Sequence, residues 1–467
     1  MVAGLSKARL YSLTIIKGTA MQTSPLDIRQ WIDERPVSGY QWLVLVLCFL
    51  IVTFDGLDAA IMGFIAPAVI ADWGISRTAF GPIMAAAMVG LAVGALVSGP
   101  YSDRLGRRRV LLWAVAAFGL FSVLCAFARS PMELAALRFL TGLGLGAAMP
   151  NSTTLLSEYV PKRLRGLLIT VMFMGFGLGS ASGGLVAAWM VPRFGWHAVL
   201  LLGGVLPLLL LPLLYFRLPE SVELMIARGF ARPRILAVLR RMGGRFADDV
   251  VFAVGAPSAK NSAAGKVREL FSLDYRWRTL SLWATYFMGL VVIYLLTGWM
   301  PMLIKDAGVS LERAAIVTAM FQFGGLIGIV LVGYLMDRLN PRAVIAVAYL
   351  GGAGCIVALG FVEVSAWALG ALVFAAGFCM NGAQTGLNAF APGQYPTEFR
   401  ATGVSWMLGM GRFGGILASV SGGALLSLGL PLQVIFAVVG VPAVFAAMAI
   451  MAGPRTPARV AQPQPGY

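Results

Sequence analysis

The feature that most constrains this chain is a series of twelve apolar stretches, each about 20 residues long. A stretch of this length crosses the hydrocarbon core of a bilayer as a helix, which satisfies its own backbone hydrogen bonds in lipid. Hydrophobic residues make up 59% of the chain and charged residues only 12%, whereas a soluble protein has roughly 25% charged residues. The sequence therefore predicts an all-α polytopic membrane protein. We expect its transmembrane helices at residues 42–62, 79–100, 109–128, 133–155, 166–190, 197–216, 278–303, 314–335, 343–362, 366–390, 401–428 and 432–452.

The scarcity of reactive side chains argues against catalysis. The chain has one histidine and four cysteines, and the cysteines all fall inside predicted spans. The sequence shows no metal-ligand cluster and no nucleophile beside a base, so an integral membrane enzyme is disfavoured. A receptor would be expected to carry a signalling domain, and the sequence shows none. We expect no catalytic residue, no metal and no cofactor.

The net charge of +16 invites a nucleic-acid interpretation, but the positions of the basic residues favour another. If both termini are cytoplasmic, only five of the 36 Lys and Arg face outside and two lie within spans, which leaves 29 on the cytoplasmic side. This asymmetry is the positive-inside pattern of membrane proteins. We therefore expect a multi-pass protein with both termini in the cytoplasm, the lipid bilayer as its surroundings and no nucleic-acid partner.

The spans divide the chain into two halves. Residues 1–41 lack the apolar core of a signal peptide, so they are expected to form a cytoplasmic tail. A polar segment between the sixth and seventh spans contains five arginines within 232–245 and is expected to include an amphipathic helix on the membrane face. The expected organisation is a tail at 1–41, six-helix bundles at 42–216 and 278–452, a central cytoplasmic loop at 217–277 and a tail at 453–467.

Two sequence motifs occur once in each half. GPYSDRLGRRR at 99–109 joins spans two and three, and GYLMDRLNPR at 333–342 joins spans eight and nine. YVPKRLRG at 159–166 and YPTEFRATG at 395–403 follow spans four and ten. Repetition at matched positions predicts related bundles whose loops make and break contacts during a conformational change. The candidate gating residues are Asp103, Arg104, Gly106, Arg107, Asp337, Arg338, Arg400 and Glu158, the last of which is equally compatible with a surface ion pair.

The 99–109 motif and its degenerate second copy resemble the signature of the major facilitator superfamily. Other stretches resemble its aromatic acid:proton symporter family, and within that family the 4-hydroxybenzoate transporters are most similar. These stretches are DGLD at 55–58, RFLTGLGLGAAMPN at 138–151, YLLTGWMP at 294–301, NGAQ at 381–384 and RATGVSWMLGMGRFG at 400–414.

The resemblance implies a major facilitator fold of two pseudo-symmetric six-helix bundles that works by alternating access. It further implies a monomeric, proton-coupled symporter in a bacterial inner membrane, which imports small aromatic carboxylates of the 4-hydroxybenzoate or protocatechuate type. Transport of another organic anion, or drug:proton antiport, stays open as an alternative. Drug antiporters often carry Gly-Pro in span five, where this chain reads GSASGG at 179–184.

Charged residues within spans are costly and mark functional sites. There are four: Asp55, Asp58, Arg138 and Arg412. Asp55 and Asp58 share one helix face, and Asp58 lies at a depth similar to that of Arg138 in span four, so the two are predicted to pair. The pair is interpreted either as a structural ion pair or as a proton site in which Asp58, together with Asp55, is the coupling acid. A carboxylate in a low-dielectric site protonates more readily, whereas a nearby arginine opposes this.

Arg412 lies near the middle of span eleven, too deep for its guanidinium to reach water easily. Its anionic partner is expected to be either the substrate carboxylate or Asp55 across the halves. Aromatic and amide side chains would supply flat walls and polar contacts for a benzoate-type ligand, although the aromatic ones are also compatible with plain packing. The substrate-binding candidates are Arg412, Asn381, Gln384, Tyr294, Trp299, Gln322 and Trp406.

Overall fold

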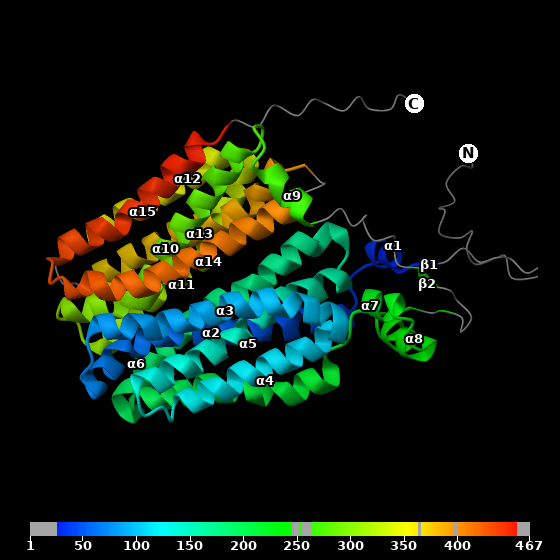
Figure 1. The fold of residues 1–467 in the computed structure, drawn as a ribbon, viewed down its shortest axis with the longest axis horizontal. Coiled ribbons are helices and arrows are strands. Elements are labelled where there is room, and N and C mark those ends of the chain that lie inside the picture. The colour runs from blue at the N-terminus through cyan, green and yellow to red at the C-terminus, as the bar shows by residue number, and fades with distance from the viewer. Residues whose placement is uncertain are drawn as a thin grey trace, which may run out of the picture.

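A computed structural model of the chain describes residues 26–244, 246, 252–253, 263–362, 366–396 and 400–454. Long helices lying side by side make up most of the molecule (Figure 1). Ten of the described helices are long and apolar enough to cross a membrane. The long helices are α2 (Gly39–Trp73), α3 (Arg77–Leu105), α4 (Arg107–Cys125), α5 (Pro131–Tyr159), α6 (Lys162–Arg217), α10 (Arg276–Asp306), α11 (Leu311–Arg338), α12 (Pro341–Leu359), α13 (Ala366–Phe390), α14 (Arg400–Ser427) and α15 (Leu432–Ala452).

These helices provide the twelve predicted spans. α6 is interrupted at Gly195, where φ 76° and ψ 173° are not helical, so this one helix contains two spans. α14 is 28 residues long, packs along α10 and completes the set. The prediction of twelve spans is therefore confirmed.

Most helices extend a few residues beyond the predicted spans because their polar caps lie outside the apolar stretches. Ser38 caps α2, and Ser76 caps α3 by accepting a hydrogen bond from Ala79 N. The predicted end of the first span at residue 62 was wrong: α2 continues through Pro67 to Trp73 and stops at Gly74, whose φ of 62° is left-handed. A prediction that assigns about 20 apolar residues to each span therefore underestimates the length of a helix that extends beyond the membrane core.

The helices form two bundles with matching internal packing. α2 packs on α6 and α3 on α5 in the first bundle, as α10 packs on α14 and α11 on α13 in the second. A Cβ on Gly142 of α5 would clash with the Ala87 carbonyl of α3, and a Cβ on Gly377 of α13 would clash with the Phe321 carbonyl of α11. Glycine allows this close backbone approach at equivalent seams. The two six-helix bundles are thus pseudo-symmetric.

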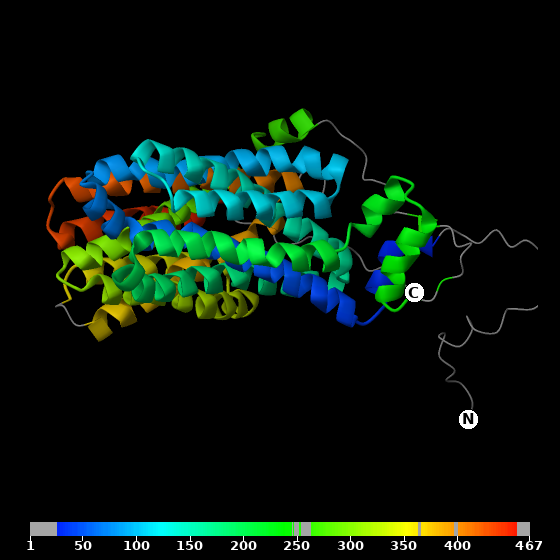
Figure 2. The ribbon, with the colours of Figure 1, turned by 90° about the horizontal axis from the view of Figure 1, so that it is seen from below.

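Short elements beside the first bundle mark one end of the molecule, named here the loop end (Figure 2). They are α1 (Ile28–Asp33), α7 (Val222–Ala227) and α8 (Arg232–Arg241). The central segment also contains α9 (Ala263–Leu270), and β2 (Phe252–Ala253) pairs in parallel with β1 (Leu26–Asp27). α8 is the expected amphipathic helix, but its Ile235 and Leu239 are buried in one core with Ile28 and Ile32 of α1. Its apolar face therefore packs on protein, and the expectation that it faces the membrane is corrected.

The two bundles meet at the end opposite the loop end, named here the far end, and diverge toward the loop end (Figure 1). At the far end, Arg77 at the start of α3 forms an ion pair of 2.6 Å with Asp306 at the end of α10. A Cβ on Gly63 of α2 would lie 2.5 Å from the Thr297 carbonyl oxygen of α10. The two bundles are therefore held together at the far end, and their helices separate toward the loop end (Figure 1).

Candidate functional site

The predicted pair of Asp58 and Arg138 forms between α2 and α5. Arg138 Nη1 donates to Asp58 Oδ1 at 3.0 Å, and Nη2 lies 2.9 Å from Oδ2. Ser122 of α4 donates a further hydrogen bond of 2.8 Å to Oδ1. The Asp58 and Arg138 side chains are 0% and 1% exposed, so each charge depends on the other for compensation. The pair ties three helices of the first bundle together.

Asp55 lies one helical turn before Asp58 and has a different environment. It is 1% exposed, and neither of its carboxylate oxygens has a hydrogen-bond partner among the described residues. The charge of Arg412 in the second bundle acts on Asp55, but no ion pair within 4.0 Å joins them. A buried carboxyl group without a close partner is stabilised in its neutral form. Among the described residues, Asp55 therefore lacks the close charge compensation that Asp58 receives from Arg138.

Arg412 lies on α14 between two tyrosines of α10. A Cβ on the neighbouring Gly411 would clash with the Tyr286 ring, and a Cβ on Gly415 would lie 2.9 Å from the Tyr294 ring. The charge of Arg412 also acts on both phenols. Within the described part of the chain, no carboxylate pairs with the Arg412 guanidinium, which is only partly buried. A guanidinium without a carboxylate partner, whose charge acts on two nearby phenol groups, is suited to bind a carboxylate.

Amide side chains from α13 border the same region. Gln384 accepts a hydrogen bond of 2.7 Å from the Tyr349 hydroxyl and lies against Tyr286. Asn388, one turn further along, also lies against Tyr286 and is exposed. The polar groups on α13 thus fix the position of one tyrosine beside Arg412.

The other amide candidates lie further from Arg412. Gln322 of α11 is 6% exposed and reaches the Thr297 hydroxyl on α10 at 3.5 Å. Asn381 donates to the carbonyl of Gly377 on its own helix at 3.3 Å. Gln322 therefore borders the site through Thr297, whereas the amide of Asn381 is used within α13.

The structure does not bring the two tryptophan candidates to Arg412. Trp299 is 1% exposed and packs against Phe80 at the far end, with ring centroids 6.2 Å apart. Trp406 is 45% exposed and stacks on Trp283, with centroids 5.8 Å apart and an interplanar angle of 9°. Trp299 is thus a packing residue of the far end, and Trp406 is an exposed residue that stacks on α10.

The candidate gating residues of the first half are held inside their own bundle. Gly106 has φ 102°, and a Cβ there would clash with the Glu220 carboxylate, which accepts a hydrogen bond of 3.2 Å from the Arg108 amide. Arg107 Nε lies 3.4 Å from Glu158 Oε1, which joins α4 to the end of α5. Arg104 is exposed, and the Asp103 side chain lies outside the described part of the structure.

The corresponding residues of the second half are on the surface. Asp337 and Arg338 are exposed, and the Arg338 guanidinium lies 4.7 Å from the centroid of the Tyr334 ring. Arg400 is exposed and donates to the Tyr395 carbonyl at 3.3 Å. Among the described residues, none of these contacts crosses between the bundles, in agreement with separation at the loop end.

Sequence reasoning missed three polar side chains of this region. Ser122 binds Asp58, Tyr349 binds Gln384, and Thr297 binds Gln322. Ser122 and Tyr349 are nearly isolated polar residues in apolar spans, whereas Thr297 is one of several polar residues in its span, and the sequence gives no further signal for any of them. Their roles depend on how the helices are rotated against one another, which hydropathy does not specify.

Comparison with known proteins agrees with this architecture. The profile of the Major Facilitator Superfamily matches residues 48–375 and again 282–466. A gallate transporter of Pseudomonas putida is 59% identical over 92% of this chain and 95% of its own. A 4-hydroxybenzoate transporter, PcaK, of Pseudomonas aeruginosa is 51% identical over 91% of this chain and 95% of its own.

Solved structures give the same fold. The inward-open xylose transporter XylE from E. coli superposes with a TM-score of 0.71 over 90% of this chain and 98% of its own, at 18% identity. A bacterial homologue of the lysosomal transporter Spinster in an inward-facing conformation gives 0.68 over 91% of this chain and 100% of its own, at 19% identity. From the profile match and the close relatives, this chain is a membrane transporter, not an enzyme, and it belongs to the Major Facilitator Superfamily.

Proposed function

We propose that this protein imports small aromatic carboxylates together with protons, and that Arg412 binds the substrate carboxylate. The observation that carries this proposal is the position of Arg412, which lies between Tyr286 and Tyr294 and lacks an ion-pair partner among the described residues. Close relatives named for gallate and 4-hydroxybenzoate support a hydroxylated benzoate as the substrate. Tyr286 and Tyr294 offer aromatic faces for such a ring.

Asp55 couples substrate binding to the proton. When Asp55 is ionised, it competes with the substrate carboxylate for the charge of Arg412, to which it is electrostatically linked. When Asp55 takes up a proton, that competition ends and the substrate anion binds. Proton and substrate are then carried together by one site. In this scheme the Asp58–Arg138 pair, whose charges compensate each other, has a structural role.

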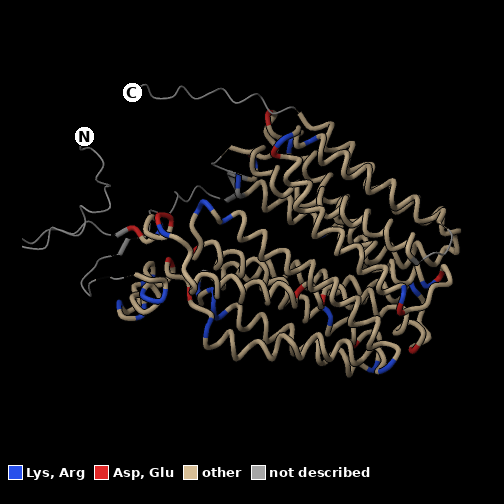
Figure 3. Tube along the Cα trace, turned by 180° about the vertical axis from the view of Figure 1, so that it is seen from behind, with Lys and Arg blue, Asp and Glu red and all other residues tan. Residues whose placement is uncertain are grey.

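The loop end faces the cytoplasm of a bacterium, and the protein lies in the inner membrane. The basic residues support this orientation: they gather at the helix ends, and the lengths of the helices are almost free of charge (Figure 3). In this orientation the conformation described here is open inward, and the Arg77–Asp306 pair closes the outer end. A single chain contributes both halves of the site, so the transporter acts as a monomer.

The test is uptake of labelled 4-hydroxybenzoate into proteoliposomes under an inward proton gradient, with and without a protonophore. Accumulation that needs the gradient and is inhibited by benzoate, protocatechuate or gallate, but not by an aliphatic acid, is the expected result. Arg412→Lys should weaken binding about 10- to 100-fold, because a charge-assisted hydrogen bond contributes about 1.5–3 kcal/mol. Arg313→Lys is the matched control, since Arg313 is exposed at the start of α11 and is not part of the proposed site. Unchanged binding in Arg412→Lys contradicts direct contact.

A further inference from the structure

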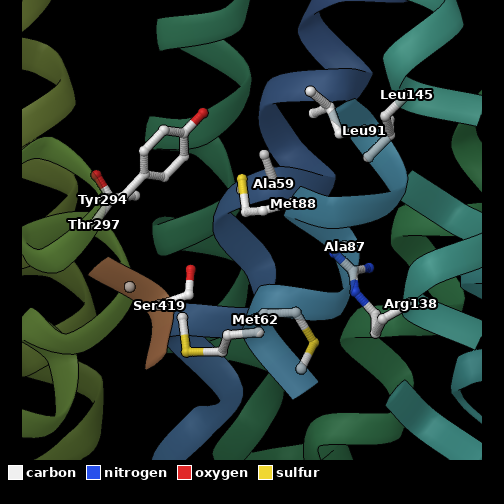
Figure 4. Close-up of a pocket in the computed structure, with 12 residues that line it drawn as sticks. Ala59, Met62, Ala87, Met88, Leu91, Arg138, Leu145, Tyr294, Thr297 and Ser419 are labelled. Atoms are coloured by element: carbon white, nitrogen blue, oxygen red, sulfur yellow. The ribbon is translucent and has the colours of Figure 1, made fainter. Parts of the chain in front are cut away.

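A small cavity of about 30 Å³ lies between the two bundles, and it shares Tyr294 with the proposed carboxylate site. Residues of α2, α3 and α5 line one side, and residues of α10 and α14 line the other (Figure 4). Its walls include Met62, Met84 and Met88, whose flexible side chains adapt readily to a ligand. The volume is that of about one water molecule or one hydroxyl group.

The cavity has polar groups that are not fully used. Ser419 donates to the Gly415 carbonyl at 2.9 Å and keeps its oxygen available as an acceptor. The Thr297 oxygen has only a long contact of 3.5 Å with Gln322. Ser419 and Thr297, which line the same side of the cavity as Tyr294, therefore offer hydroxyl oxygens to a polar group placed there (Figure 4).

The position of the cavity relates it to Arg412. Ser419 follows Arg412 by seven residues, which is about 10 Å along α14 toward the far end. Thr297 follows Tyr294 by one turn of α10, and both line the cavity. A benzoate held by its carboxylate at Arg412, with its ring against Tyr294, directs its opposite edge toward this cavity.

We propose that the cavity receives a hydroxyl group on the ring edge opposite the carboxylate, and that Thr297 and Ser419 determine the preference for ring-hydroxylated over unsubstituted aromatic acids. This inference rests on the proposed function. The substrate hydroxyl donates to the hydroxyl oxygen of Ser419 or Thr297. The hydroxyl takes the place of one water, so the preference arises from hydrogen bonds that benzoate does not make.

The test compares binding of benzoate and 4-hydroxybenzoate to purified protein by isothermal titration calorimetry. Thr297→Val and Ser419→Ala should each reduce the preference for 4-hydroxybenzoate about three- to tenfold while leaving the affinity for benzoate unchanged. Thr318→Val is the matched control, because Thr318 is a buried hydroxyl that bonds only to the Ala314 carbonyl of its own helix. The control should keep the wild-type preference.

A second variant fills the space instead of removing a hydroxyl group. Ala87 lines the cavity from α3, so Ala87→Leu should reduce binding of 4-hydroxybenzoate more than that of benzoate. An unchanged ratio in all three site variants, or an equal loss for both acids, overturns the inference while the proposed function stands. Wild-type protein that binds neither acid overturns the proposed function itself.

Discussion

Replacing Asp58 by Asn removes the counter-ion of a guanidinium that is 1% exposed. The carboxylate has contacts of 3.0 and 2.9 Å with Arg138 and accepts a further hydrogen bond of 2.8 Å from Ser122, and a neutral amide cannot compensate the remaining charge. Breaking a buried ion pair in this way costs about 3–5 kcal/mol. That is a large part of a typical unfolding free energy of about 5–15 kcal/mol.

Asp55→Asn is the matched comparison, one helical turn away on the same face of α2. Its carboxylate oxygens have no hydrogen-bond partner among the described residues, so the substitution removes no bond and should change the unfolding free energy by less than about 1 kcal/mol. We expect Asp58→Asn to be destabilised and Asp55→Asn to be as stable as the wild type but defective in proton coupling.

Thermal unfolding in detergent, followed by tryptophan fluorescence, measures this difference. At roughly 2 °C per kcal/mol, Asp58→Asn should melt about 6–10 °C below the wild type, while Asp55→Asn should melt close to it. The double variant Asp58→Asn, Arg138→Gln should recover part of the loss, because no uncompensated charge remains. Equal destabilisation by Asp55→Asn and Asp58→Asn would refute the division of roles between the two carboxylates.

Three further outcomes follow from the geometry. The affinity for 4-hydroxybenzoate should rise as pH falls, and calorimetry above about pH 6, where the substrate carboxyl stays ionised, measures this dependence. Asp55→Asn should abolish the pH dependence of the affinity, and a variant that keeps it contradicts the scheme. Gly106→Ala should lower the stability by about 1–2 kcal/mol, because φ at Gly106 is 102° and a Cβ there would clash with the Glu220 carboxylate. Gly99→Ala is the control and should not lower the stability, because a Cβ on Gly99 would have no atom within 4 Å. Equal melting temperatures of the two variants argue against this strain. Arg77→Ala or Asp306→Ala should loosen the far end and increase labelling of cysteines introduced there, and unchanged labelling would show that the ion pair does not hold it closed.

The sequence was a good guide to the spans, for a physical reason. Lipid selects long apolar helices, and the positive-inside rule orients them, so hydropathy and charge were enough to count twelve. The helix ends were less predictable. α2 runs beyond residue 62 to Trp73 because its sequence stays apolar through Pro67, and a Pro in a membrane helix need not end it.

The site was predictable where depth alone decided the contact. Asp58 and Arg138 were predicted at similar depths in spans one and four, and their carboxylate and guanidinium meet. Side-chain direction was not predictable, since it depends on helix rotation. Trp406 precedes Arg412 by six residues, or about 600° of helical turn, so the two side chains lie about 120° apart on α14, and Trp406 is 45% exposed. Ser122 was missed because nothing in the sequence indicates which face of α4 meets Asp58.

The central claim is that one proton, held by Asp55, moves with each aromatic anion bound at Arg412. The most direct measurement is the pH of a weakly buffered medium outside proteoliposomes when 4-hydroxybenzoate is added. We predict that the wild type alkalinises the medium as it takes up substrate, and that Asp55→Asn still exchanges substrate across the membrane without moving protons. Substrate-dependent alkalinisation of equal size by Asp55→Asn would contradict this account.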